Sequence, residues 1–385
     1  MKRIRLIILL SLISLLSFAQ GPKLSKDAEI SILTCSPGPQ LHEIFGHSAI
    51  RISDKENKID WVFGWGTFDF DTPNFYTKFV KGSLLYTISL TNYRNFIYTY
   101  KYYKRSVYEQ TLNLDSLSKQ QIVNAIIENY KPENRFYKYD FQLDNCATRI
   151  RDIIEKNCSS KINYSFTDQD KSFRDILREF LKPFPWTDWG INTVLGKNLD
   201  DKANIREYMY IPNYVMSLFD SASVNGTKIV NKKEVVYQAP QTIFKTKWYL
   251  NPGFILSIIA LLIFLYSAFS IKKRIRTRWL DYILFGLLGI IGIIIAFLCF
   301  FSDYHSMPWN YNLLIFLPTH IFALFLLHKK ENIYLKSYFL ISAIIGILVL
   351  FLFYITSMAS QVLPLASIPL VLIIVLRSYM ISKNK

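Results

Sequence analysis

The chain has 385 residues, and its 45 lysines and arginines against 29 aspartates and glutamates give a formal net charge of +16. That length leaves room for a soluble domain with its own core and for a further part. The charge is unevenly spread, because 14 of the basic residues lie before residue 20 or after residue 250. The stretch 20–250 keeps 31 basic and 26 acidic residues, a net charge of +5, which is too mild to indicate nucleic-acid binding. A weak attraction to anionic lipid headgroups is enough to explain this excess.

The first 19 residues have the zones of a secretory signal peptide: the charged MKRIR, the apolar LIILLSLISLL and the small-residue SFA. Ser17 and Ala19 suit the −3 and −1 positions, so cleavage is predicted after Ala19. An uncleaved membrane anchor is the alternative. Under both interpretations the domain that follows, residues 20–250, is expected to be exported.

The exported stretch mixes strand and helix patterns, which predicts an α+β domain. Alternating apolar residues indicate strands at 28–34 and 46–53, followed by the apolar strand DWVFGW. Helical spacing appears in SKQQIVNAIIENY (118–130) and in NCATRIRDIIEKN (145–157). Helical pieces near 171–182, 187–196 and 207–220 and then a hairpin lead towards the membrane part.

Residues 251–385 predict an all-α transmembrane domain. Five apolar segments are each close to the ~20 residues that a helix needs to cross a bilayer: 252–270, 280–301, 311–328, 337–357 and 362–380. Basic residues follow the first and third segments and occupy the tail, whereas the loops 302–310 and 356–361 hold none. Because basic loops stay cytoplasmic, these two loops and the exported domain are predicted to share the outer side.

Three of the four cysteines, Cys35, Cys146 and Cys158, lie in the exported domain, and Cys299 lies in a membrane segment. An odd number of cysteines cannot all pair within one domain, so at least one free thiol is expected. In an oxidising compartment a free thiol needs an explanation.

The exported domain has two histidines, His42 and His47, which stand five residues apart in HEIFGH. The zinc-protease motif HExxH needs a spacing of four on one helical face, and the following GHSAIRI alternates like a strand. No metal site is therefore predicted.

Cys146 has the position that best suits a nucleophile. Asp144 or Asn145 is a good N-cap, which places Cys146 in the first turn of a helix. There the helix dipole and the free N–H groups favour a thiolate, and the same groups can stabilise the oxyanion of an acyl-transfer intermediate. Cys158 lies at the opposite end of that helix, where the dipole opposes ionisation, and Cys35 precedes a Pro-Gly turn.

His47 begins a strand and is the candidate general base, because a strand is a rigid support for such a group. The residues alone leave two other interpretations open. His47 could be a core or edge histidine paired with a backbone carbonyl, and Cys146 could be a small buried hydrophobe.

A resemblance carries the interpretation further. A histidine on an early strand followed by a cysteine at a helix N-terminus is similar to the order in permuted papain-like folds of the NlpC/P60 and lecithin:retinol acyltransferase type. The motifs FGHSAIRI, FGWGTFDFDTPNFYTKFVKG, DNCATRIRDII and PWTDWGINTVLGKNLD more closely resemble the Lnb family of lipoprotein N-acyltransferases, as does the five-segment membrane part. The resemblance assigns the family's catalytic cysteine to Cys146 and its histidine to His47. Asp60, on the strand after His47, is the candidate for a third catalytic member, although it could merely begin that strand.

Two residues are candidates for substrate binding. Asn145 precedes the nucleophile, although it could serve only as the helix cap. His305 lies in the outer loop, where polar residues close to the bilayer often face a site. A plain interfacial loop anchored by Trp309 is the alternative for His305.

The resemblance implies a periplasm-facing acyltransferase in the cytoplasmic membrane of a diderm bacterium. Cys146 would take an acyl chain from a phospholipid as a thioester and pass it to the α-amino group of a diacylglyceryl-cysteine lipoprotein. No cofactor is needed, because an ester donor is already activated. The alternatives are an NlpC/P60-like cysteine peptidase or amidase, a lipid hydrolase at the membrane, and a sensor or transporter subunit with a degenerate domain.

Overall fold

The computed structural model describes residues 21–165, 170–240, 246–275, 277–325, 332–355 and 361–383, so the predicted signal peptide lies outside the described residues. The chain divides into two compact units. Unit 1 comprises Met1–Phe75, Ser83–Gln169 and Asn204–Gln241, and unit 2 comprises Tyr76–Gly82, Asp170–Ala203 and Thr242–Lys385. The predicted domain boundary at residue 250 therefore differs from the boundaries of these two units, because two earlier segments group with the membrane helices.

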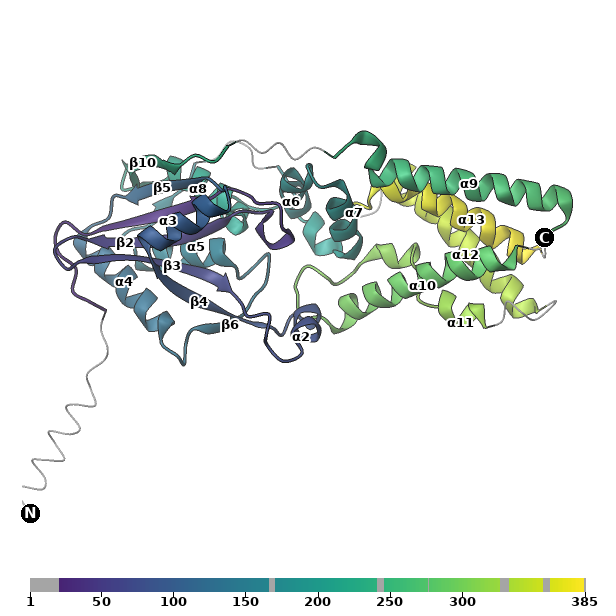
Figure 1. Ribbon diagram of the computed structural model, residues 1–385, viewed down its shortest axis with the longest axis horizontal. Coiled ribbons are helices and arrows are strands. Elements are labelled where there is room, and N and C mark those ends of the chain that lie inside the picture. The colour runs from purple at the N-terminus through teal and green to yellow at the C-terminus, as the bar shows by residue number, and fades with distance from the viewer. Residues whose placement is uncertain are drawn as a thin grey trace, which may run out of the picture. The chain divides into compact units, whose positions relative to one another are not determined.

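Unit 1 is built on a seven-stranded sheet in which every neighbouring pair is antiparallel, with the order β10-β5-β1-β2-β3-β4-β6. The strands are β1 (Glu29–Cys35), β2 (His47–Asp54), β3 (Ile59–Thr67), β4 (Leu85–Asn92), β5 (Val107–Leu112), β6 (Phe136–Lys138) and β10 (Val230–Tyr237). The predicted strands at 28–34 and 46–53 are confirmed. Figure 1 shows the sheet and its helices.

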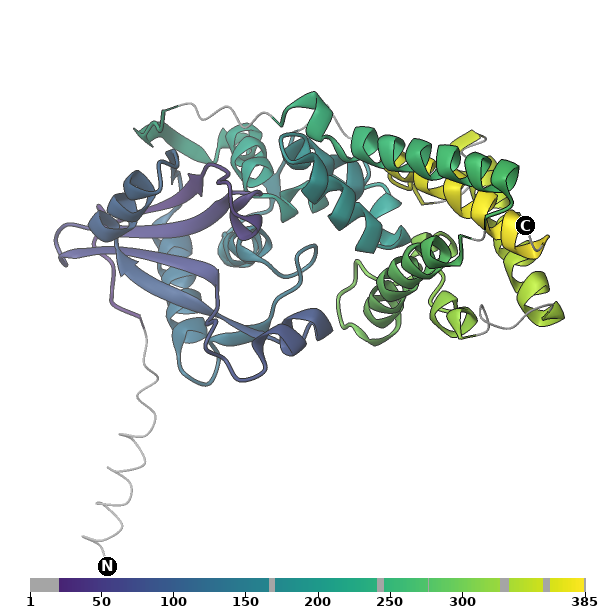
Figure 2. The ribbon, with the colours of Figure 1, turned by 45° about the vertical axis from the view of Figure 1, so that its right-hand side comes forward.

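Helices cover both faces of this sheet. Helix α3 (Tyr93–Tyr102) packs Phe96 and Ile97 against side chains of β1, β2 and β3. Helices α4 (Ser116–Tyr130) and α5 (Cys146–Asn157) lie on the other side, as Figure 2 shows. Because neighbouring residues of a strand point to opposite faces, both faces of the central strands are apolar and buried.

A smaller part of unit 1 follows α5. A three-stranded sheet consists of β7 (Ile162–Asn163), β8 (Ser223–Val224) and β9 (Thr227–Lys228). The helix predicted over 207–220 is two elements, the 3₁₀ turn η3 (Glu207–Tyr210) and helix α8 (Pro212–Ser221). Pro212 explains the break, because proline has no N–H to continue a helix but suits its first turn.

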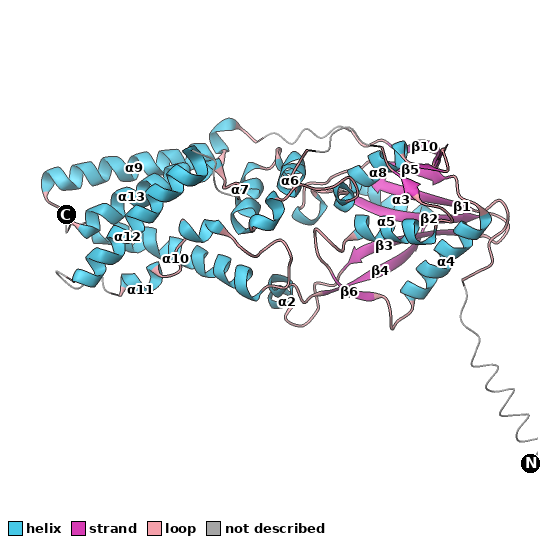
Figure 3. Cartoon of the chain, turned by 180° about the vertical axis from the view of Figure 1, so that it is seen from behind, coloured by secondary structure: helices cyan, strands magenta, loops and turns pink. Residues whose placement is uncertain are grey.

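Unit 2 contains four helices long and apolar enough to cross a membrane among the residues described (Figure 3). They are α9 (Pro252–Lys273), α10 (Arg278–Phe301), α12 (Ile333–Val349, continued by a π-helical stretch Leu350–Ile355) and α13 (Ile368–Ser382, preceded by the 3₁₀ turn Leu365–Ser367). Phe285, Phe316 and Phe339 are fully buried in the core of this bundle, while many other apolar side chains face outwards.

The predicted third spanning helix, 311–328, is not one helix over its described part. It contains only the 3₁₀ turn η5 (Tyr311–Leu314) and the short helix α11 (His320–Leu324). The backbone between them passes very close to α10 at Gly292, where an added Cβ would lie 2.2 Å from the Phe316 carbonyl oxygen. Pro318 removes a further helical donor. The prediction of five spanning helices is therefore not confirmed.

Helices α6 (Phe173–Leu181) and α7 (Pro185–Val194) and the 3₁₀ turn η2 (Lys197–Asp200) form a cap on the loops at one end of the long apolar helices. The Gln361 amide donates to the Leu195 carbonyl (3.2 Å), and the Asn310 amide donates to the Thr193 carbonyl (2.9 Å). A Cβ on Gly196 would lie 1.8 Å from the Pro308 carbonyl oxygen. The loop 302–310 and residue 361 thus lie at the same end of unit 2, as the loop charges predicted.

The remaining short elements are α2 (Phe75–Lys81), η1 (Leu41–Glu43) and η4 (Trp248–Leu250). Helix α2 joins the outer loop of unit 2, because the Asp303 N–H donates to the Lys81 carbonyl (2.8 Å) and the Tyr304 hydroxyl donates to the Phe79 carbonyl (2.9 Å).

Candidate active site

Cys146 is the first residue of α5, as the sequence predicted, and Asn145 is the N-cap. The Asn145 Oδ1 accepts hydrogen bonds from the N–H groups of Ala147 (2.8 Å) and Thr148 (3.0 Å). The Thr148 Oγ1 accepts from the Asn145 N–H (2.8 Å), which completes a capping box. These bonds fix the first turn of α5 and the direction of the Cys146 side chain.

The prediction that Asn145 binds substrate is wrong. Its Nδ2 donates to the carbonyls of Phe141 (2.6 Å) and Tyr210 (2.9 Å), so both ends of the amide are occupied. The residue is 3% exposed. Asn145 therefore positions the nucleophile and has no polar group left for a substrate.

Burial determines the protonation of Cys146. Desolvation raises the pKa of the thiol above its ordinary value, and the N–H groups of Ser48, Ala147 and Cys146 itself, which point at the sulfur, lower it in part. The helix N-terminus was expected to produce a thiolate, but burial outweighs it. The thiol thus keeps its proton near neutral pH.

His47 lies at the strand end that meets this thiol. It is the first residue of β2, and the next residue, Ser48, directs its backbone N–H at the Cys146 sulfur, so this end of β2 meets the start of α5. Burial and, as the smaller cause, the positive charge of Arg105 together lower the pKa of His47 to about 4. The imidazole is therefore neutral at neutral pH and can accept a proton.

A glycine makes room for the His47 ring. A Cβ on Gly64, in the neighbouring strand β3, would lie 3.1 Å from His47 Nε2, a tight contact that the ring would have to relieve by a small shift. Ser89 stands opposite Gly64 on β4, and its Oγ would lie 3.8 Å from the same Cβ. The Ser89 hydroxyl donates to the Gly64 carbonyl (3.3 Å) and accepts from the Thr67 hydroxyl (2.9 Å).

The prediction that Asp60 is the third catalytic member is wrong. Asp60 pairs with Ser53 across β2 and β3, six residues from His47, which corresponds to roughly 20 Å along the strand. Its carboxylate binds the Arg51 guanidinium (2.7 Å) and is 47% exposed. Asp60 therefore cannot orient His47.

No local pattern in the sequence points to Arg105, which is 6% exposed. Its Nε donates to the Ser36 carbonyl (2.9 Å) and its Nη1 to the Glu43 carboxylate (3.0 Å). Its Nη2 is buried and has no hydrogen-bond partner among the described residues. The positive charge lowers the pKa of both His47 and Cys146. Arg105 precedes β5, far from both residues in sequence, so only the fold brings it to the site.

The other thiols lack these features. Cys35 is fully buried, which raises its pKa to about 12, and Cys158 forms the C-cap of α5. His42 is exposed on η1, with its ring 6.2 Å from that of Phe68. Among the residues described, no group of three or more histidine, cysteine, aspartate or glutamate side chains is arranged to hold a metal ion.

Two family models match the chain. The Lnb N-terminal periplasmic domain matches residues 24–185, and the Lnb transmembrane domain matches residues 244–385. The chain belongs to the Lnb family. No curated protein and no solved structure matches it. Membership of the Lnb family indicates a membrane enzyme of lipoprotein processing, located in the inner membrane and carrying a periplasmic domain.

The two Lnb matches divide the predicted site residues. The first match contains both His47 and Cys146, and the second contains the four long apolar helices and His305. His305 lies in the outer loop of unit 2, where its backbone carbonyl accepts a hydrogen bond from the Asn198 amide (2.8 Å). A substrate-binding role for His305 stays a prediction.

Proposed function

We propose that this Lnb protein transfers an acyl chain from a phospholipid to the α-amino group of a diacylglyceryl-cysteine lipoprotein, through a thioester on Cys146. One observation carries the proposal. The thiol at the start of α5 meets the strand end that begins with a neutral, half-buried histidine, in a chain that also has four long apolar helices. The catalytic pair follows the family resemblance, and the permuted papain-like fold belongs to the same proposal.

The reaction has two half-reactions. His47 takes the Cys146 proton while the sulfur attacks the ester carbonyl of the donor, which forms a C–S bond and an oxyanion. Collapse of this intermediate breaks the C–O bond, and the imidazolium returns the proton to the departing alkoxide, which leaves as a lysophospholipid. The lipoprotein amine then attacks the thioester, its proton passes to His47, and the restored thiol completes the cycle.

The backbone supplies the stabilisation of the oxyanion. The N–H of Ala147 is already bound to the Asn145 cap, which weakens it as a donor. The N–H groups of Cys146 and Ser48 both point at the sulfur, and in this proposal they turn to the oxyanion that forms beside it. Fixed donors of this kind typically contribute a factor of about 10²–10³ in rate.

The membrane helices support lipid substrates. A phospholipid and a lipoprotein anchor both reside at the bilayer surface, and a peptidase or amidase has no need of a multi-helix membrane domain. We propose that the unit with Cys146 and the 302–310 loop face the periplasm, and that His305 contacts a lipid headgroup. If so, His305→Ala lowers transfer without lowering protein abundance, and full activity would leave the loop with a structural role.

Incubation with acyl-labelled phospholipid tests the proposal. Without acceptor, the protein should carry the label in a bond that hydroxylamine cleaves, and Cys146→Ala should abolish this labelling. Cys158→Ala, at the other end of α5, is the matched control and should label normally. A diacylated lipoprotein should then remove the label as a hydroxylamine-resistant amide. Release of free fatty acid whatever acceptor is present would instead identify a lipid hydrolase.

A further inference from the structure

A connected row of aromatic rings runs from the catalytic cysteine to the surface of unit 1. We define the aromatic row as Tyr139, Tyr86, Phe68, Phe70 and Phe75. The Tyr139 and Tyr86 rings are stacked at 4.5 Å, and Phe68 follows at 5.2 Å from Tyr86. Phe70 lies 4.9 Å from Phe68, and Phe75 lies 5.0 Å from Phe70. Each step is a normal aromatic contact, so the rings form one continuous apolar strip.

The inner end of the aromatic row lies beside Cys146. Asp140 and Asp144 exchange backbone hydrogen bonds (3.1 and 2.9 Å) and form an antiparallel bridge. This bridge closes a tight loop and places Tyr139 across from Asn145, the residue before the nucleophile. Burial raises the pKa of Tyr139, and the charge of an ionised Cys146 raises it further, which agrees with the closeness of the two residues.

Gly66 opens the path for the next rings. It has φ +95°, a conformation that favours glycine, and the register between β3 and β4 shifts between Trp65 and Thr67. A Cβ on Gly66 would lie 3.8 Å from the Tyr139 ring. The bulge therefore ends β3 at the aromatic row and directs the chain into Phe68 and Phe70.

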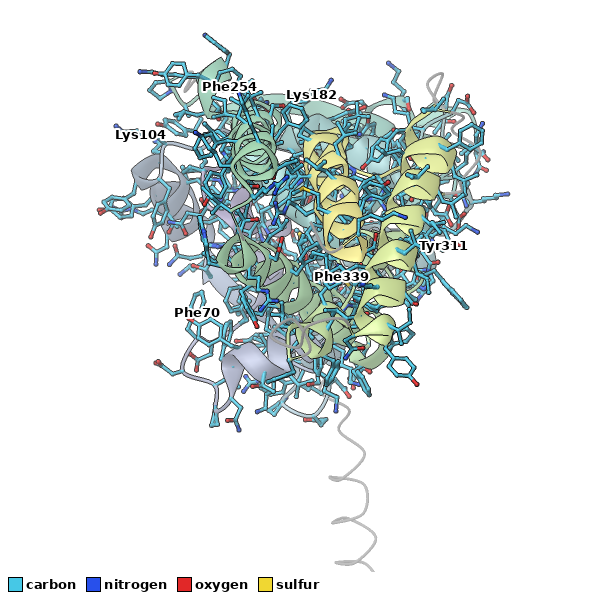
Figure 4. The ribbon with its side chains drawn as sticks, turned by 90° about the vertical axis from the view of Figure 1, so that its right-hand side faces the viewer. Phe70, Lys104, Lys182, Phe254, Tyr311 and Phe339 are labelled. Carbon is cyan, nitrogen blue, oxygen red and sulfur yellow. The ribbon has the colours of Figure 1, made fainter. Side chains whose placement is uncertain are left out.

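The outer end of the aromatic row is open to solvent. Tyr86 is 6% exposed, Phe68 and Phe75 are half-buried, and Phe70 is 63% exposed. Figure 4 shows the Phe70 side chain at the surface of the molecule. Single exposed hydrophobic residues are ordinary, but a contiguous strip that continues to a nucleophile indicates an apolar ligand.

We propose that the aromatic row binds the acyl chain of the Cys146 thioester, so that these rings determine acyl-chain preference. The proposal rests on the acyl transfer proposed above and names where the chain lies. The carbonyl carbon of a thioester is fixed at the sulfur, so its chain must leave along a surface that begins there, and the aromatic row begins there. Water would otherwise solvate each methylene of that chain.

The test measures acyl-enzyme formation on the full-length protein in detergent micelles, with phosphatidylcholines carrying hexanoyl, decanoyl or tetradecanoyl chains. Intact-protein mass spectrometry identifies the chain on Cys146. In the wild type, each methylene covered by the row should raise the apparent second-order rate by up to about fourfold. Phe70→Ala should flatten this dependence for the longer chains. Phe68→Ala should flatten the chain-length dependence at shorter chains, between the hexanoyl and the decanoyl donor.

Phe136→Ala is the matched control, because Phe136 is 52% exposed on the edge strand β6 and is not in the aromatic row. It should keep the wild-type chain-length profile. Phe70 is exposed, so its replacement should not impair folding, and alkylation of Cys146 by iodoacetamide checks the site in every variant. If Phe70→Ala and Phe68→Ala keep the wild-type profile while the thioester still forms, the acyl chain lies elsewhere. If no thioester forms in the wild type from any donor, acyl transfer itself is wrong.

Discussion

Two buried arginines, one in each unit, show how differently the chain uses polar groups. Arg174, in the cap of unit 2, binds Asp200 through Nε and Nη2 (2.8 and 3.0 Å). It also donates to the Asn192 side chain (2.8 Å) and the Gly196 carbonyl (2.7 Å). Arg105, beside Cys146, donates through Nε and Nη1 only and keeps Nη2 unpaired among the described residues.

The difference separates a structural network from an active site. A buried charge with all its donors paired is stable as it stands and holds backbone segments together. A buried charge with an unpaired donor costs free energy in the resting protein, and it leaves an electric field on the groups nearby. Here that field acts on His47 and Cys146. The four predictions that follow test this contrast from the largest expected effect to the smallest.

Breaking the Arg174 network should have the largest effect. Arg174→Met leaves Asp200 as an uncompensated buried charge and should lower the free energy of unfolding by about 3–5 kcal/mol. Thermal unfolding in detergent micelles, followed by tryptophan fluorescence, measures the loss. Arg178→Met is the control, since Arg178 lies on the same helix, is 38% exposed and has a single long ion pair (3.5 Å). Its loss should stay below about 1 kcal/mol. If both variants lower the free energy of unfolding by the same amount, the structural role assigned to Arg174 is wrong.

Crowding His47 should have the second-largest effect, which is a slower acylation of Cys146. Gly64→Ala would push His47 Nε2 by a few tenths of an ångström, so acylation should be slower, but by less than the about 10²-fold loss that a displacement of about 1 Å can cause. The rate of Cys146 acylation is the measurement. Gly190→Ala is the control, because nothing lies within 4 Å of its added Cβ.

A double-mutant cycle locates the cause of that effect. If Gly64→Ala acts through His47, it should add almost nothing in a His47→Ala background, which is itself expected to be slowed about 10²–10⁴-fold. If the two losses in acylation rate are additive, Gly64 acts through the structure of the sheet and not through His47.

The sequence contained the parts of this site that follow from local pattern. Cys146 at a helix start and His47 at a strand start are visible in a few consecutive residues. The register of β2 and β3 is not, which explains why Asp60 was assigned to a site six residues away. Arg105 and Gly64 become part of the site only when three strands pair, and no local pattern marks either residue.

The same limit applies to unit 2. Hydropathy counts apolar residues, so it cannot detect that Gly292 on α10 admits a non-helical backbone at Phe316 or that Gly289 admits Ile321 of α11. Composition likewise assigns the polar segment 170–203 to the exported domain. Its packing partners are the outer loops of the membrane helices, reached through side-chain pairs such as Gln361 with Leu195.

Removing the Arg105 charge should change the pH dependence of the site. Burial and the Arg105 charge keep the pKa of His47 at about 4, so the imidazole is neutral above that pH and the reaction fails as pH falls through it. Arg105→Gln removes a positive neighbour, which raises the pKa of His47 and moves the acid limb to higher pH by up to about one unit. The pH profile of Cys146 acylation by phospholipid reports this shift, because the thiol has a raised pKa and keeps its proton over this pH range. Arg51→Gln should leave the limb in place, and an unchanged limb in Arg105→Gln would refute the field effect.

The Asp60 ion pair should have the smallest effect. Asp60→Asn weakens an ion pair whose carboxylate is 47% exposed, and such pairs contribute about 0.2–1 kcal/mol to stability. Arg51 keeps its hydrogen bonds to the Glu109 carboxylate (3.1 Å), so no buried charge is left alone. Because Asp60 lies roughly 20 Å from His47 along β2, the rate and the pH profile of Cys146 acylation should match the wild type. A tenfold or greater fall in that rate, with unfolding unchanged, would return Asp60 to the catalytic group and overturn the placement of the site at the His47 end of the strand.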